Sequence, residues 1–339
     1  MYKQDTPLDA VSISDLTLDY ILDADGQPHL HLLGGKGLYA AVGMWLWGLR
    51  VGLAVSPGCD FDLTHLQPLS QAGIDVRGVQ LHPTTTTLCW AQQYGPDGER
   101  LSWNPHRHYA GLADPPVDPA SLPDIDGISP SFVVRAHHVD LTGLPDAYIT
   151  AAACHFAGDE FLRYPESIVG WKERGTLLTL DADWYSGPAL TEASAAAALA
   201  PLVGFGAILP SREDVAHLFG LGVDVHFAAR TIGQCTGALV AVKLGVAGSL
   251  VYQPRLDCFD HIPIVPVIAV DPTGAGDAYA GGFLAGLLKT GDPLEAALWA
   301  TVSASFVVEG YGAAFALERA TADERDRRLA VLRQQTADR

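Results

Sequence analysis

The stretch Asp271-Pro272-Thr273-Gly274-Ala275-Gly276-Asp277-Ala278-Tyr279 decides the fold of this chain. It follows the apolar run Ile262–Val270, which predicts a strand, and it leads into the small-residue run Ala278–Leu288, which predicts a helix. Backbone N–H groups at the start of a helix have no intrahelical partner and attract anions, above all phosphate. Because Asp277 is itself negative, its carboxylate must have another task. The stretch predicts that loop amides bind a transferring phosphoryl group while Asp277 takes a proton from the attacking hydroxyl.

Two better-known glycine motifs do not fit this loop. A dinucleotide-binding fingerprint needs a third glycine, and Tyr279 stands in its place. A P-loop needs the pattern G-x-x-x-x-G-K-[ST], which the chain lacks. A bare Gly274-Ala275-Gly276-Asp277 also fits a tight turn with Asp277 as a helix cap, so the alternative of a purely structural turn stays open at this point.

Composition limits the classes of partner. The 21 lysines and arginines against 39 aspartates and glutamates give a net charge of −18, which argues against nucleic acid or an anionic membrane surface as a partner. No stretch reaches the roughly 18 apolar residues of a membrane span, and we see no signal peptide. Five cysteines without a C-x-x-C pair indicate a reducing compartment, so we expect a cytoplasmic protein.

Strand-like and helix-like runs alternate along most of the chain, which predicts an α/β fold with a mostly parallel sheet covered on both faces. The expected strands are 11–15, 51–55, 177–180, 207–209, 238–244 and 249–252. The expected helices are 35–49, 63–72, 212–219, 278–288, 293–308 and 322–335.

One region breaks this alternation. Two β-rich runs, 84–93 and 99–103, flank the turn signal Tyr94–Gly98, and a second turn signal lies between Asp19 and His29. We expect a small β-sheet lid built from roughly 18–34 and 84–112 on a single domain of residues 1–339. The segment 113–130, which is rich in proline and aspartate, is expected to be an irregular loop.

Two motifs carry a resemblance to a known family. The string Asp271–Asp277 before a Gly281-Gly282 helix, and the string Gly34-Gly35-Lys36-Gly37 followed by Ala40-Ala41, resemble the two signatures of the ribokinase/PfkB family of carbohydrate and nucleoside kinases. The resemblance extends over most of the chain. It implies a ribokinase-like three-layer α/β/α sandwich with a β-sheet lid, and an ATP-dependent kinase that uses Mg²⁺.

The resemblance implies the catalytic residues. Asp277 would act as general base, and the amides of Gly274, Ala275 and Gly276 would form the anion hole for the γ-phosphoryl group. On the acceptor side it implies Asp19, Gly34, Gly35, Lys36 and Tyr39. Asp15 competes with Asp19 for the role of sugar ligand, and whichever is not the ligand is expected to cap a turn.

The resemblance also implies the nucleotide and cation residues. It places Lys243, Gly245, Gly248 and Thr301 beside the nucleotide, although a buried helical threonine explains Thr301 equally well. It further implies Asp214 near Mg²⁺, and Asp271 with Thr273 beside a monovalent cation such as K⁺.

Three departures leave the acceptor open. Tyr39 replaces an Asn that commonly binds sugar, Ser211-Arg212-Glu213-Asp214 replaces Asn-x-x-Glu, and Asp181-Ala182-Asp183 replaces Asp-x-Asn. The leading expectation is phosphorylation of a sugar or sugar derivative. One alternative is a nucleoside kinase, in which Trp90 or Tyr94 stacks a base; another is a non-catalytic sugar- or nucleotide-binding regulatory protein. A homodimer formed through the lid is a further expectation from the family.

Overall fold

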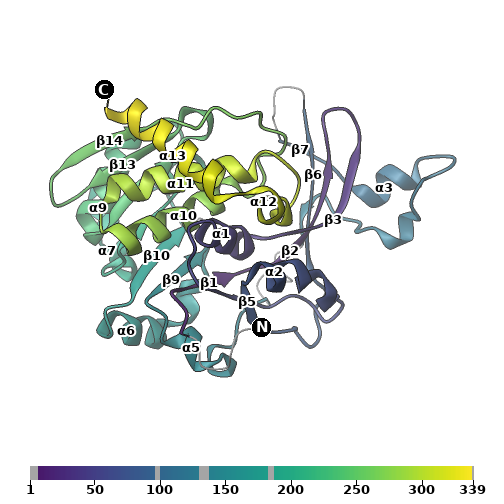
Figure 1. Cartoon of the computed structure of the whole chain (residues 1–339), viewed down its shortest axis with the longest axis horizontal. Coiled ribbons are helices and arrows are strands. Elements are labelled where there is room, and N and C mark those ends of the chain that lie inside the picture. Colours follow the sequence, from purple (N-terminus) through teal and green to yellow (C-terminus); the bar gives the residue numbers. More distant parts are fainter. Residues whose placement is uncertain (1–6, 96–99, 130–136, 182–186, 338–339) are drawn as a thin grey trace.

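A large, mostly parallel sheet forms the centre of the molecule (Figure 1). The computed structural model describes residues 7–95, 100–129, 137–181 and 187–337. The strand order is β14-β13-β12-β11-β10-β9-β1-β4-β5; neighbours from β12 to β5 are parallel, whereas β13 and β14 are antiparallel. The strands are β1 Ala10–Ser14, β4 Val51–Val55, β5 Asp75–Val79, β9 Ala153–Ala157, β10 Leu177–Asp181, β11 Ala207–Ile208, β12 Leu239–Lys243, β13 Ser249–Gln253 and β14 Cys258–Ile262.

Helices cover both faces of this sheet, so the predicted three-layer α/β/α sandwich is confirmed. One apolar core lies under α1 Lys36–Trp45, α2 Gln67–Ala72, α10 Ala275–Thr290, α11 Pro293–Val307, α12 Ala313–Arg319 and α13 Ala322–Ala337. A second core lies under α5 Asp146–Ile149, α6 Pro165–Glu173, α7 Glu192–Leu199, α8 Arg212–Phe219 and α9 Val225–Thr236. Within the described ranges, no helix has both the length and the apolar character needed to cross a membrane.

Short 3₁₀ helices complete the connections between these elements. They are η1 Leu63–Leu66, η2 Pro119–Ser121, η3 Leu141–Gly143, η4 Glu160–Arg163, η5 Ala200–Leu202 and η6 Gly245–Ala247.

The predicted lid is a second sheet, which projects from the main body (Figure 1). It consists of β2 Thr17–Leu22, β3 Pro28–Gly34, β6 Leu88–Tyr94, β7 Arg100–Ser102 and β8 Gly127–Ile128, and α3 Pro105–Ala110 follows β7. The tip of the β6–β7 hairpin, 96–99, lies outside the described residues, as does Pro130. The prediction that 113–130 is irregular was wrong at two places, because β8 pairs with β6 and η2 forms a 3₁₀ turn.

The predicted strand over Ile262–Val270 was also wrong. Strand β14 ends at Ile262, and residues 263–269 have no regular structure. Pro263 and Pro266 explain this difference, since a proline has no N–H with which to continue a sheet ladder. The following helix, α10, begins at Ala275 instead of Ala278. The glycines therefore belong to the first turn of the helix.

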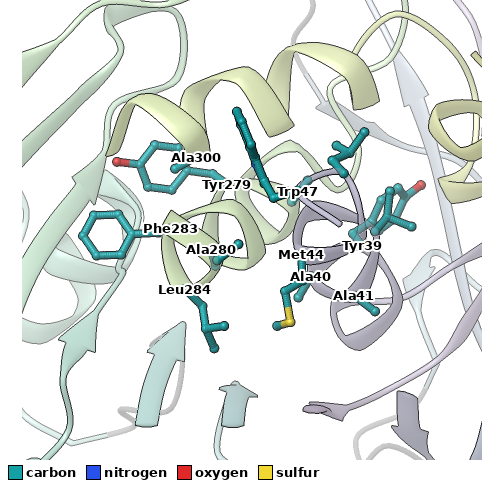
Figure 2. Close-up of a cluster of buried hydrophobic side chains, with 14 of the residues drawn as sticks. Tyr39, Ala40, Ala41, Met44, Trp47, Tyr279, Ala280, Phe283, Leu284 and Ala300 are labelled. Atoms are coloured by element: carbon teal, nitrogen blue, oxygen red, sulfur yellow. The ribbon is translucent and has the colours of Figure 1, made fainter. Parts of the chain in front are cut away.

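Helices α1 and α10 pack with their backbones unusually close. A Cβ on Gly43 would lie 2.2 Å from the carbonyl oxygen of Ala278, and a Cβ on Gly281 would lie 1.9 Å from that of Ala40. Figure 2 shows α1 and α10 side by side, with Ala40 and Met44 of α1 on the side towards α10, and Tyr39 and Phe283 pointing away from the close contact of the two backbones. This packing brings Tyr39 of α1 against the start of α10.

Candidate active site

Two cavities meet at the glycine loop that precedes α10. The first lies between the lid and the main sheet, and its wall includes Thr17, Asp19, Lys36, Tyr39, Trp90, Gln92, Thr273, Gly274 and Asp277. The second lies beside β12 and α11, and its wall includes Lys243, Gly245, Gly248, Pro272, Gly276, Tyr279 and Thr301. Gly276 and Asp277 are adjacent in the chain but face different cavities. The loop is therefore placed to connect ligands bound on its two sides.

The first turn of α10 has the shape of an anion site. Gly274 is the N-cap residue, with φ of 75°, which favours glycine. Its amide and that of Gly276 lie where a helix leaves N–H groups without intrahelical partners. The Ala275 N–H, which was also expected to bind the anion, donates to the carbonyl oxygen of Pro272 at 3.2 Å. That bond closes the turn and leaves the amides of Gly274 and Gly276 as the stronger candidates for binding an anion.

Asp277 lies in the first turn of α10 amid several charged groups. Its burial is the main cause that raises its pKa to about 7, and the nearby carboxylate of Asp181 acts in the same direction. The positive charges of Lys243 and Lys36 lower that pKa. A carboxyl group that titrates near neutral pH suits a general base.

Asp181 and Lys243 form an ion pair beside the loop. Lys243 Nζ lies 2.5 Å from Asp181 Oδ2, and both side chains are largely buried. Burial acts to lower the pKa of Lys243, but the facing carboxylates of Asp181, Asp277 and Asp214 outweigh it and raise the pKa. Lys243 therefore carries a fixed positive charge between the two cavities. The neighbouring Asp183 lies outside the described residues.

The two aspartates near β2 make different hydrogen bonds. Asp15 Oδ1 accepts a hydrogen bond from the backbone N–H of Lys36 at 2.7 Å, which holds the start of α1. Asp19 is 2% exposed and accepts from Thr17 Oγ1 at 2.6 Å. Burial raises the pKa of Asp19 to about 7. Both aspartates line the first cavity. Among the described residues, Asp15 is bonded to the start of α1, and no such bond is seen for Asp19.

Gly34 and Gly35 let the chain pass close to these groups. A Cβ on Gly34 would lie 2.0 Å from Asp19 Oδ2, and one on Gly35 would lie 2.7 Å from Leu16 Cα. Tyr39 is 2% exposed, and its hydroxyl has no hydrogen-bond partner among the described residues. Its ring packs on Gly274, where an added Cβ would lie 2.2 Å from Tyr39 Cγ.

The two residues expected beside a monovalent cation, Asp271 and Thr273, lie together, but the Thr273 hydroxyl already has hydrogen-bond partners. Asp271 is 1% exposed, and its Oδ1 accepts from the backbone N–H of Thr273 at 2.9 Å. The hydroxyl of Thr273 bonds to two lid side chains, Gln92 at 2.9 Å and Tyr94 at 2.6 Å. Because Tyr94 is buried in this contact, it is not a surface group free to stack on a base.

The residues expected beside the nucleotide, Lys243, Gly245, Gly248 and Thr301, all line the second cavity, whereas Asp214 is not among its lining residues. Thr301 Oγ1 donates to the carbonyl of Ala297 at 2.9 Å, a bond within its own helix. Asp214 forms a capping box with Ser211 at the start of α8, in which Asp214 Oδ2 accepts from the Ser211 N–H at 2.6 Å. Gly245 and Gly248 both have positive φ, and a Cβ on Gly248 would lie 2.0 Å from the Ile262 carbonyl oxygen.

Sequence reasoning did not assign a role to Gln92 or to the pairing of Asp181 with Lys243. Gln92 carried no motif, although its place two residues from Trp90 on a predicted strand puts both on one face. Asp181 stood in a quoted family motif, but its partner lies 62 residues away.

Comparison with known proteins decides the family. The model of the pfkB family of carbohydrate kinases matches residues 185–320. A cytidine kinase of Thermococcus kodakarensis is 28% identical over 85% of this chain and 91% of its own length. A nucleoside kinase of Methanothermobacter thermautotrophicus is 27% identical over 90% of both chains. The chain belongs to the PfkB/ribokinase family.

A solved structure agrees on the fold of this PfkB-family chain. Arabidopsis thaliana ribokinase, complexed with ribose and ATP, superposes with a TM-score of 0.69 at 16% identity and covers 96% of this chain and 99% of its own. The PfkB-family protein is a phosphotransferase with an alcohol group as acceptor, and it binds ATP.

Proposed function

We propose that this PfkB-family kinase transfers the γ-phosphoryl group of ATP to a hydroxyl of a sugar derivative, with Asp277 as general base. The observation that carries the proposal is the position of Asp277 and the Gly274 and Gly276 amides at the junction of two cavities. The acceptor binds in the first cavity under the lid, and ATP binds in the second. The phosphoryl group then crosses at the first turn of α10.

Each group at the junction has one task in the transfer. The acceptor oxygen forms a bond to the γ-phosphorus, its proton passes to the Asp277 carboxylate, and the bond from phosphorus to the bridging oxygen of ADP breaks. The Gly274 and Gly276 amides donate to the phosphoryl oxygens as charge develops on them. Lys243 offsets the negative charge of Asp181 and Asp277, which would otherwise repel the phosphates.

We further propose that Asp214 helps to hold the Mg²⁺ that ATP brings with it. Asp214 is near enough to Lys243 to raise the pKa of that lysine, and its Oδ2 also accepts the capping bond at the start of α8. One protein carboxylate is enough when phosphate oxygens and water supply the other Mg²⁺ ligands. Bound Mg²⁺ would neutralise charge on the phosphates.

Within the class of sugar derivatives, two observations favour a nucleoside. The lid side chain Trp90 lines the first cavity, where an aromatic ring can stack on a base. In addition, two relatives that match nearly the whole chain are named cytidine kinase and nucleoside kinase. A free sugar remains the second candidate, because Asp19 and the Gly34-Gly35 turn can bind sugar hydroxyl groups without any contact to a base.

The experiment that tests the proposal is an ADP-release screen over sugars and nucleosides, with product identified by mass spectrometry. Turnover on nucleosides, with free pentoses and hexoses poor, is the expected result. Turnover on free sugars alone would move the acceptor class to the second candidate. Thermal stabilisation by sugars or nucleosides without any ADP release would contradict the proposal as a whole.

The pH dependence of the rate should follow Asp277. Because the base must be ionised and its pKa is raised to about 7, kcat/KM is expected to fall as the pH drops through about 7. Lys243→Met removes a positive charge that lowers this pKa, so the acid limb should move to higher pH. Lys172→Met on α6, whose ammonium donates to the Val203 carbonyl, is the matched control and should leave the limb unmoved. An unshifted limb in Lys243→Met would contradict the electrostatic role of Lys243.

A monovalent cation is expected to activate the enzyme through Asp271. Asp271 is buried beside the anion loop and holds the Thr273 amide, so a cation near it would raise the positive field at the phosphate. The rate should be higher in KCl than in tetramethylammonium chloride at equal ionic strength. Asp271→Asn should lose most of this difference, and equal rates in both salts for the native enzyme would exclude the role.

A further inference from the structure

Gln92 is a buried amide on the cavity side of lid strand β6. Gln92 is 3% exposed, and it lines the first cavity together with Asp19 and Trp90. In the parallel pairing of β2 with β6, Asp19 lies opposite Trp90, and Gln92 is the next residue on the same face. Asp19 and Gln92 therefore lie on the same face of the lid sheet, on neighbouring strands.

The two ends of this amide have different partners. Gln92 Nε2 donates to Thr273 Oγ1 at 2.9 Å and also lies against the hydroxyl of Tyr94. Gln92 Oε1 is buried and has no hydrogen-bond partner among the described residues. A buried carbonyl oxygen without a donor is unfavourable, so a ligand that offers a donor at this point would be bound preferentially.

The bonded end reaches the anion loop directly. Thr273 immediately precedes Gly274, and its backbone N–H is held by Asp271. Gln92 is thus a single side chain that lines the acceptor cavity and bonds through Nε2 to the loop that precedes α10. A group that fixes the amide plane at Oε1 also fixes the hydrogen bond at Nε2, because the amide is planar and rigid.

We propose that Gln92 is a specificity and positioning residue: its Oε1 accepts a hydrogen bond from a hydroxyl or amino group of the acceptor, and its Nε2 transmits acceptor binding to the anion loop through Thr273. This inference rests on the proposed function and deepens it. Asp19, when ionised, and Gln92 Oε1 both only accept hydrogen bonds. The acceptor therefore carries two donor groups beyond the hydroxyl that is phosphorylated, as a nucleoside or a polyol does.

The test combines one substitution with a set of deoxy analogues of the acceptor found in the screen. Gln92→Met keeps the side-chain length and removes both polar ends. We expect its KM for the acceptor to rise about 3- to 10-fold, the value of one hydrogen bond, and its kcat to fall as well. Thr273→Val removes the hydroxyl that bonds to Gln92 Nε2 and to Tyr94, and it leaves Gln92 Oε1 in place, so it should lower kcat more than it raises the acceptor KM.

The analogues separate a direct contact from a change in folding. In the native enzyme, one deoxy or deamino analogue should lose about 3- to 10-fold in kcat/KM, and Gln92→Met should no longer distinguish that analogue from the parent acceptor. Gln93→Met, on the opposite face of β6 and half-buried, is the control and should behave as the native enzyme does. Gln92→Ala replaces Gln92→Met if the latter fails to fold, as judged by its melting temperature.

The outcomes distinguish this inference from the proposed function. If the native enzyme phosphorylates an acceptor but Gln92→Met matches Gln93→Met with every analogue, the role of Gln92 is overturned and the proposed function stands. A native enzyme that phosphorylates no sugar or nucleoside overturns both.

Discussion

Replacing Asp277 with Asn is expected to lower kcat by about 10²- to 10⁴-fold, the usual contribution of a general base. The amide has the shape of the carboxylate but cannot take the proton from the acceptor hydroxyl. ATP binding should be retained or strengthened, because a negative charge near the phosphates is removed. Rapid-quench measurement of product at saturating ATP and acceptor, together with calorimetric titration of ATP, gives both quantities.

The same substitution should stabilise the fold at neutral pH. The pKa of Asp277 is raised in the folded chain, so the folded state holds the charged form less well than the unfolded state does. The penalty exists above the unfolded pKa of about 4 and grows as the pH rises towards about 7. Asp277→Asn should therefore melt at a higher temperature than the native chain at pH 8, with the difference shrinking towards pH 4.

Asp292→Asn is the matched control for this prediction. Asp292 is an exposed N-cap that accepts from the Leu294 N–H at 2.8 Å at the start of α11. Asn caps a helix about as well as Asp, so activity and stability should both stay near native. Native-like turnover in Asp277→Asn would remove Asp277 from the role of base.

The candidate catalytic loop could be proposed from the sequence because all its residues are consecutive. Positive φ at Gly274 and the free amides of a helix start are local properties, and neither depends on distant strands. The close packing of Gly43 against α10 could be anticipated only from the many small residues in both helices. The layered α/β architecture could be predicted from the alternating strand-like and helix-like runs, because each run is also a local pattern.

Several of the errors and omissions concern contacts between distant segments. Strand β8 joins the lid by pairing with β6 although its own two residues carry no strand pattern. The bond between Gln92 and Thr273 spans 181 residues, and that between Lys243 and Asp181 spans 62. The first pair depends on how the lid packs against the main body, and the second depends on the order of strands β10, β11 and β12 within the main sheet. The strand predicted at Ile262–Val270 failed because apolar content was weighed above the two prolines.

Replacing Gly274 with Ala is expected to lower kcat by about 10²- to 10³-fold, as the loss of one oxyanion-type donor does. The new Cβ would lie 2.2 to 2.4 Å from three atoms of the Tyr39 ring. Tyr39 is held on α1, and Gly43 and Gly281 lock α1 against α10, so the ring has little room to withdraw. The loop must move instead, and the Gly274 and Gly276 amides move with it.

Gly291→Ala isolates the catalytic effect from the cost of the backbone conformation. Gly291 ends the same helix with φ of 68°, close to the 75° of Gly274, and an added Cβ there meets nothing within 4 Å. Gly291→Ala should lose about 1 to 2 kcal/mol of stability from a left-handed alanine. Gly274→Ala should lose more than that, because its Cβ also meets the Tyr39 ring, and only Gly274→Ala should lose kcat. Gly274→Ala should also be made in a Tyr39→Ala background, where the ring that the new Cβ meets is absent. There it should lower kcat by a smaller factor than it does in the native chain. If Gly274→Ala turns over as fast as Gly291→Ala, the amides of this turn do not stabilise the transferring phosphoryl group.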